Sequence, residues 1–152
     1  MKNIFKLSTI VFFSIISINS FAKSSCHNAV ESEHADAMLD DLNDWSSVYQ
    51  YYEKYSKHGC YSEGYYGESI ADSVVKILAN KWNTLDELST NSKKNKKFKA
   101  FVLSKIDSTV SSDDLIKIHE LANNKCPKNS LKLCKIIDKE TVKAFEEMGG
   151  KF

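Results

Sequence analysis

The chain contains no arginine, and it has only one proline and five glycines in 152 residues. Without arginine, bidentate recognition of phosphate or carboxylate by a guanidinium group is excluded. An all-β sandwich needs a turn signal about every 8–12 residues, and this chain has too few glycines and prolines to supply them. Its 21 basic residues, all lysines, face 20 acidic residues, and the net charge of +1 is not the basic surplus of a nucleic-acid binder. We therefore predict a mainly helical protein that does not bind nucleic acid.

The first 22 residues have the pattern of a secretory signal peptide. Two lysines precede an apolar run over residues 7–18, and residues 20–22 (Ser-Phe-Ala) offer small side chains at the cleavage positions. An uncleaved anchor is the alternative, but the apolar run is shorter than the roughly 20 residues that a spanning helix needs. We predict a signal peptide over 1–22 and a single helical domain over 23–152. The mature domain would be periplasmic or secreted, with no stable membrane anchor.

All four cysteines lie in the predicted mature part, at Cys26, Cys60, Cys126 and Cys134. An even number of cysteines in an exported chain indicates two disulfides, for which three connectivities exist. We favour Cys26–Cys60 and Cys126–Cys134, because near neighbours meet most easily across a short loop. A zinc site is the alternative, and the lack of any C-x2-C pair argues against it. We expect no metal and no cofactor.

Apolar residues recur at three- and four-residue steps along most of the mature chain, which indicates amphipathic helices. The expected segments are a short helix near 32–42, a helix from Asp44 as N-cap to Gly59, a helix from Ser62 to about Trp82, a short turn at 84–88 capped by Thr84, a lysine-rich low-complexity stretch at 91–97, a helix from Phe98 to about Asp107, a helix capped by Ser112, and a last helix from about Ser130 to Met148. The predicted fold class is all-α, a compact bundle of five to six antiparallel helices stapled by two disulfides.

Few catalytic patterns are present. The four histidines form no H-E-x-x-H pair, and Glu31 with His34 is better interpreted as a solvated helix face than as a pair of metal ligands. No G-x-S-x-G elbow occurs. The Glu68-Ser69 pair resembles the catalytic region of lytic transglycosylases, in which a carboxylic acid protonates the glycosidic oxygen, but the later Gly-Leu-Met-Gln-like stretch of that family is missing. We expect Glu68 to be an exposed helix residue and the protein not to be an enzyme.

The tyrosines are concentrated in one short region, since all seven lie between residues 49 and 66. One narrow helix face cannot bury Tyr49, Tyr51, Tyr52 and Tyr55 together, so we expect some of these rings to be exposed. Tyrosine is enriched at protein interfaces, where its rigid ring and polar tip both contribute. The predicted protein-binding residues are Tyr51, Tyr55, Tyr61, Glu63, Tyr65, Tyr66 and Glu68. The alternative is that most of the rings are half-buried core residues.

Five lysines are clustered between Lys93 and Lys99. Such a cluster attracts anionic lipid headgroups at about 1 kcal/mol per lysine near a membrane surface. The alternative, which we favour from the sequence alone, is a solvated loop or helix start.

Several short motifs between Gly59 and Cys134 resemble those of small secreted bacterial proteins of unassigned function. These motifs are Gly59-Cys60 with Glu63-Gly64-Tyr65, Leu78-Ala79 with Trp82, Phe98, Phe101-Val102-Leu103 with Ile106-Asp107, and Cys126-Pro127 with Cys134. More distantly, the size, export signal, helical pattern and paired cysteines are similar to the periplasmic immunity proteins that protect bacteria from peptidoglycan-cutting type VI secretion effectors. That resemblance implies a small helical protein that occludes an effector's active site.

The predicted function is therefore that of a periplasmic protein-binding module, an immunity protein or inhibitor that sterically blocks a secreted toxin or a cell-wall enzyme. Two alternatives stay open. One is an envelope glycan hydrolase that uses Glu68, and the other is a structural or stress-related envelope protein without enzymatic activity.

Overall fold

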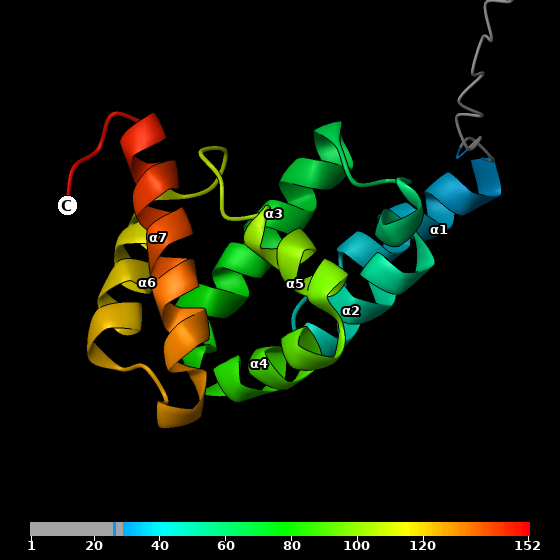
Figure 1. Cartoon of the computed structure of the whole chain (residues 1–152). Coiled ribbons are helices and arrows are strands. Elements are labelled where there is room, and N and C mark those ends of the chain that lie inside the picture. The colour runs from blue at the N-terminus through cyan, green and yellow to red at the C-terminus, as the bar shows by residue number, and fades with distance from the viewer. Residues whose placement is uncertain (1–25, 27–28) are drawn as a thin grey trace, which may run out of the picture.

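The computed structural model describes Cys26 and residues 29–152, so the predicted signal peptide lies outside the described residues. The described part of the chain forms seven α-helices, joined by loops and three short 3-10 helices, and contains no β-strand (Figure 1). The helices are α1 (Ala29–Leu39), α2 (Trp45–Lys54), α3 (Gly64–Asn80), α4 (Leu85–Lys94), α5 (Lys96–Leu103), α6 (Ser112–Asn124) and α7 (Leu131–Glu147). The all-α prediction is confirmed, with one helix more than the five to six expected.

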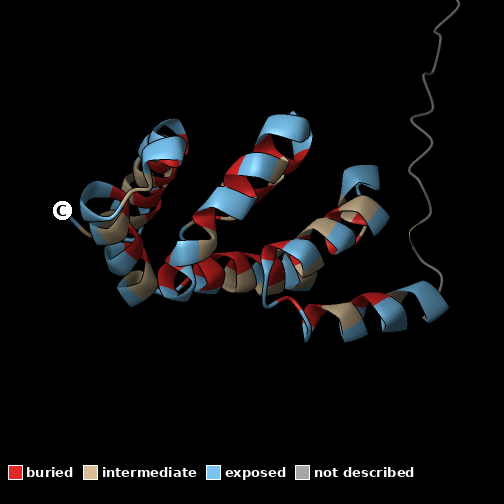
Figure 2. Ribbon diagram, turned by 90° about the horizontal axis from the view of Figure 1, so that it is seen from below, coloured by how far each residue is buried: buried red, intermediate tan, exposed pale blue. Residues whose placement is uncertain are grey.

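Helix α3 lies in the middle of the molecule. It contacts α1 and α2 toward one end and α6 toward the other, and α6 in turn lies alongside α7 (Figure 1). The buried residues of α3 spread over a wide arc, because Val74, Val75, Ile77, Leu78 and Ala79 are all buried. A helix with apolar residues on more than one face can be covered by several neighbours at once. In Figure 2 the buried residues accordingly follow the sides that the helices turn toward one another.

The start of α2 follows the predicted signal at Asp44, but the helix ends at Lys54, before the predicted Gly59. A side-chain oxygen of Asp44 accepts a hydrogen bond from the Ser47 backbone at 2.8 Å, and the Ser47 hydroxyl accepts one from the Asp44 backbone at 3.3 Å. The bond from the Ser47 backbone is the main reason that the pKa of Asp44 lies below its ordinary value. After α2 ends, a 3-10 turn over Ser56–His58 carries the chain to Gly59, whose φ of 76° is in the left-handed region that glycine favours.

The additional helix arises in the lysine-rich stretch. The turn expected at 84–88 continues as α4 to Lys94, and α5 begins two residues later. Asn95 separates the two helices, because its backbone is extended and its side chain accepts a hydrogen bond from the Phe98 backbone at 3.0 Å. The low-complexity composition of residues 91–97 therefore conceals the end of one helix and the start of the next.

Two predicted caps are wrong. The hydroxyl of Thr84 does not cap α4, because it donates to the Lys81 carbonyl at 2.7 Å and accepts from the Trp45 indole at 2.9 Å. The cap of α6 is Ser111 rather than Ser112, since the Ser111 hydroxyl is the one that accepts from the Asp114 backbone, at 3.4 Å.

Both predicted disulfides are present, Cys26–Cys60 and Cys126–Cys134. The first joins the segment before α1 to the loop after α2. The second joins the α6–α7 connection to the first turn of α7. Disulfides form and persist in oxidising compartments, so the pairs indicate an extracellular or periplasmic environment. None of the helices in the described part of the chain has the length and apolar content that crossing a membrane requires.

The two disulfides are expected to stabilise the fold unequally. They close loops with sequence separations of 34 and 8 residues. From chain entropy, removing the disulfide that closes the longer loop lowers the unfolding free energy by about 4 kcal/mol, and removing the other lowers it by about 2.5 kcal/mol. Denaturant unfolding of the Cys26→Ala/Cys60→Ala and Cys126→Ala/Cys134→Ala pairs measures the two losses. Equal losses, or a larger loss for the second pair, would contradict the expectation.

Candidate functional site

The candidate site is the segment from Gly59 to Glu68, here termed the 59–68 segment, which leads from the end of α2 into the first turns of α3. Three of its residues have left-handed backbones, with φ of 76° at Gly59, 45° at Tyr61 and 56° at Gly64. Glycine adopts this region freely, whereas a residue with a side chain such as Tyr61 is strained there by about 1–2 kcal/mol. Such strain persists only where the surroundings hold the backbone in place.

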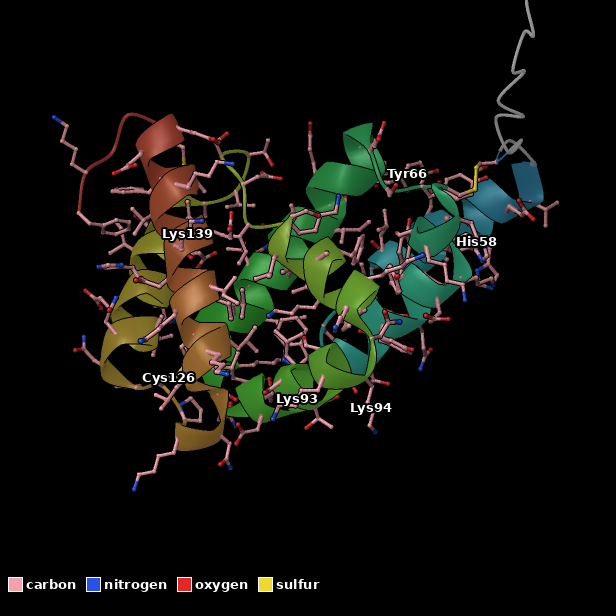
Figure 3. The ribbon with its side chains drawn as sticks, viewed as in Figure 1. His58, Tyr66, Lys93, Lys94, Cys126 and Lys139 are labelled. Atoms are coloured by element: carbon pink, nitrogen blue, oxygen red, sulfur yellow. A yellow bond between two sulfur atoms is a disulfide. The ribbon has the colours of Figure 1, made fainter. Side chains whose placement is uncertain are left out.

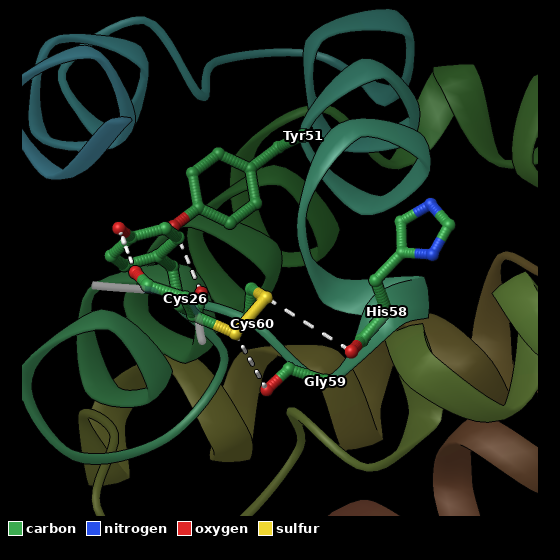
Figure 4. Close-up of a disulfide and its surroundings, with 6 residues drawn as sticks. Cys26, Tyr51, His58, Gly59 and Cys60 are labelled. Atoms are coloured by element: carbon green, nitrogen blue, oxygen red, sulfur yellow. Dashed lines mark hydrogen bonds between the residues drawn. A yellow bond between two sulfur atoms is a disulfide. The ribbon is translucent and has the colours of Figure 1, made fainter. Parts of the chain in front are cut away.

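Two hydrogen bonds and a disulfide hold Tyr61 and its neighbours in place (Figure 4). The Tyr51 hydroxyl donates to the Tyr61 backbone carbonyl at 2.9 Å, and the Tyr61 hydroxyl donates to the Cys26 carbonyl. The disulfide between Cys60 and Cys26 joins the same two stretches covalently. Its sulfurs lie 4.0 Å from the carbonyl oxygens of His58 and Gly59, and because an oxidised sulfur carries no hydrogen, these are packing contacts.

Burial also favours the protonated form of the Tyr51 hydroxyl, which is the form that donates this hydrogen bond. Tyr51 has no exposed surface, and desolvation raises the pKa of its hydroxyl above the ordinary value. The hydroxyl therefore stays protonated at physiological pH and remains a hydrogen-bond donor to the Tyr61 carbonyl.

A second support comes from the region after α5. The Nζ atom of Lys105 donates to the Ser62 backbone carbonyl at 2.8 Å, and partial burial lowers the pKa of the Lys105 ammonium group. The same carbonyl lies close to Gly67, because a Cβ atom built at position 67 would be 2.9 Å from it. Ser62 is therefore in contact both with the start of α3 and with the chain beyond α5.

The rings of five tyrosines form a continuous chain of contacts through this region. Centroid separations are 5.2 Å for Tyr51–Tyr55, 5.3 Å for Tyr55–Tyr61, 4.9 Å for Tyr61–Tyr66 and 5.5 Å for Tyr66–Tyr65. These are the separations of favourable edge-to-face and tilted aromatic pairs. The chain begins in the core and ends at Tyr65, which is 67% exposed.

The structure divides the predicted binding residues into two groups. Tyr51, Tyr55 and Tyr61 are buried, with exposed fractions of 0%, 4% and 9%, so the expectation that these rings form an exposed contact surface is wrong. Tyr66 is half-buried, and Glu63, Tyr65 and Glu68 are exposed and lie at or near the start of α3.

Tyr51 and Tyr55 are buried because α2 is covered on two sides. The 59–68 segment covers the side of Tyr51 and Tyr55, while the Tyr52 ring packs against Phe98 and Phe101 of α5, at 5.4 and 5.1 Å between centroids. The expected exposure of these rings depended on a single buried face of the helix. The role of Lys105 was missed as well, because no local motif marks a lysine that binds a carbonyl 43 residues away.

The residues considered for catalysis or metal binding lie apart from one another in the structure or at the surface. Glu68 is an exposed residue of α3, as the sequence indicated. His34 lies beside α2, with its Nδ1 atom 3.0 Å from the Tyr55 hydroxyl and 3.3 Å from Lys54 Nζ. Among the described residues, no group of three or more histidines, cysteines or carboxylates is placed to hold a metal ion.

Comparison of the chain with protein-family models, with curated proteins and with solved structures finds no match.

Replacing Gly67 by alanine tests how closely the 59–68 segment packs. Alanine in place of a helical glycine ordinarily stabilises a protein by about 0.5–1 kcal/mol. Here the new Cβ atom would meet the Ser62 carbonyl oxygen at 2.9 Å, a backbone atom that cannot easily move. We expect Gly67→Ala to lower the unfolding free energy by roughly 1–3 kcal/mol. Glu68→Ala, at the adjacent exposed position, is the control and should change stability little; a stabilising Gly67→Ala would disprove the close packing.

Proposed function

We propose that this protein is an exported protein-binding module, an immunity protein or inhibitor that covers the cleft of a secreted toxin or a cell-wall enzyme. The observation that supports this function is an exposed aromatic residue on a rigid support. Tyr65 is 67% exposed, yet its ring lies 5.5 Å from that of half-buried Tyr66, and the aromatic chain continues from there into the core. Exposed tyrosines backed by a fixed framework are typical anchors of protein interfaces.

The proposed mechanism is steric. Tyr65 would enter a pocket of the partner, and the exposed carboxylates of Glu63 and Glu68 would pair with cationic groups around it. The disulfide, the Tyr51 hydroxyl and Lys105 order the segment before any partner arrives. A segment that is already ordered loses less conformational entropy on binding, which leaves more of the contact energy for affinity.

The proposed location follows from two features. The first 22 residues have the pattern of a signal peptide, and the two disulfides indicate an oxidising compartment. A periplasmic or secreted protein of this kind meets secreted toxins and cell-wall enzymes directly, so these are the proposed partners.

The test is co-purification from the periplasm of the native host, using the full chain with a C-terminal tag. We expect one secreted or wall-active protein in stoichiometric amount, and inhibition of its activity by the purified chain. Tyr65→Ala should weaken that binding by about 2 kcal/mol, or roughly 30-fold, if Tyr65 is the anchor.

Ile116→Ala provides the matched control, because Ile116 is also an exposed apolar residue but lies on α6, outside the 59–68 segment. Its affinity should equal that of the native protein. Equal weakening by both substitutions would contradict the assignment of the surface, and the absence of any stoichiometric partner would contradict the proposed function.

A further inference from the structure

A second candidate site lies away from the 59–68 segment, between α4, the start of α5 and the start of α7. A surface cavity of about 420 Å³ is found there, a volume within the usual range of small-molecule sites. Its lining combines four lysines with two leucines, and the remaining members are polar: Ser89, Ser92, Lys93, Lys99, Lys128, Asn129, Ser130, Leu131, Lys132 and Leu133. Figure 3 shows Lys93 and Lys94 on α4, at some distance from Tyr66 and His58.

The charge of this cavity has one sign. Lys93, Lys99, Lys128 and Lys132 line it, and the lining contains no carboxylate among the described residues. None of these four ammonium groups forms an ion pair with another described residue. Four unpaired lysines around one cavity repel one another, and a bound anion relieves that repulsion.

The start of α7 adds a further preference for negative charge. The first amide groups of a helix have no partner within the helix, and they carry the positive end of its dipole. Ser130 stands at the N-cap position, but its hydroxyl donates to the Asp86 carboxylate at 2.7 Å and does not cap the helix. The first turn of α7, which contributes Leu131, Lys132 and Leu133 to the cavity, therefore has neither a side-chain cap nor an acidic residue.

A buried serine is a second and independent indication of a ligand. Ser92 is only 6% exposed and lines the cavity, yet its hydroxyl has no hydrogen-bond partner in the described structure. A buried polar group without a partner costs free energy, and so such groups are rare unless a ligand or water satisfies them. The hydroxyl oxygen is itself buried, so a bound anion would accept its hydrogen bond once the Ser92 side chain turns toward the cavity.

The apolar part of the lining indicates that the ligand has an apolar group as well as a negative charge. Leu133 is buried, while Leu131 is 55% exposed beside the lysines, although both belong to the first turn of the same helix. An inorganic anion would leave the exposed Leu131 side chain in contact with water. We propose that the cavity binds an anionic amphiphile, with its carboxylate or phosphate at the lysines and Ser92 and a short acyl chain against Leu131 and Leu133.

The experiment is a titration of the ¹⁵N-labelled protein with octanoate, followed by NMR. We expect saturable shifts at the amides of Ser92 and Leu131–Leu133. In contrast, 1-octanol lacks the charge and inorganic phosphate lacks the chain, so each should bind at least tenfold more weakly. Equally tight binding of 1-octanol, or of phosphate, would overturn the assignment of an anionic amphiphile, and an absence of shifts at these amides would overturn the site.

Charge substitutions locate the headgroup. Lys93→Gln/Lys132→Gln removes two cavity lysines and should weaken octanoate binding about tenfold. Lys94→Gln/Lys139→Gln removes the same charge from exposed positions of α4 and α7 outside the cavity, and should change the affinity less than twofold. Equal weakening in both variants would show a general charge effect and contradict the cavity.

Vesicles of phosphatidylglycerol distinguish a free amphiphile from a membrane lipid. Binding to vesicles that octanoate displaces, and that Lys93→Gln/Lys132→Gln impairs more than the control variant does, would assign the same cavity to a lipid headgroup and chain. Vesicle binding that both variants impair equally, without any octanoate site, would contradict the proposal.

Discussion

A fully buried phenol must place its hydroxyl against an acceptor, and Tyr51 meets this requirement with the backbone carbonyl of Tyr61. The same bond satisfies a carbonyl in a residue whose backbone is left-handed, so it both pairs two polar groups and maintains a strained turn. Tyr61 in turn donates to the Cys26 carbonyl, and the disulfide from Cys60 closes the arrangement. The position of Tyr65 at the surface depends on these contacts, because its ring rests on Tyr66 and through it on Tyr61.

The two candidate sites differ in chemistry although the net charge of the chain is only +1. At the start of α3, the exposed residues include one tyrosine, Tyr65, and two glutamates, Glu63 and Glu68, which suits a protein partner with cationic groups. Between α4 and α7, four lysines and two leucines line one cavity, which suits an anionic amphiphile. The net charge is therefore nearly zero although charges of one sign are grouped locally. The folded chain produces this grouping by bringing Lys93 and Lys99 beside Lys128 and Lys132.

Much of the fold was predictable because its signals are local. Helical periodicity, the Asp44 cap and the Cys126–Cys134 pair each depend on residues close together in the chain, and each prediction was confirmed. The Cys26–Cys60 pair, which joins more distant residues, was confirmed as well, whereas α2 ends at Lys54 and not at the predicted Gly59. Several of the errors arose where the outcome depends on contacts between distant segments. Tyr51 and Tyr55 are buried because a loop folds over α2. Thr84 accepts a hydrogen bond from Trp45 and does not cap its own helix, and Lys105 donates to a carbonyl far away in the chain. The cavity likewise joins residues separated by about 40 positions, which no sequence pattern indicates.

Native-state hydrogen exchange tests whether the 59–68 segment is ordered before it meets a partner. The amides of Gly59 and Cys60 donate to the carbonyls of Ser56 and Tyr55, and in the native protein they should exchange slowly. Tyr51→Phe keeps the ring but removes the hydroxyl, and should speed their exchange at least about tenfold relative to the amides of α7, while Tyr65→Phe should have no effect. Rapid exchange in the native protein, or unchanged exchange in Tyr51→Phe, would show that the Tyr51 hydroxyl does not hold the segment in place.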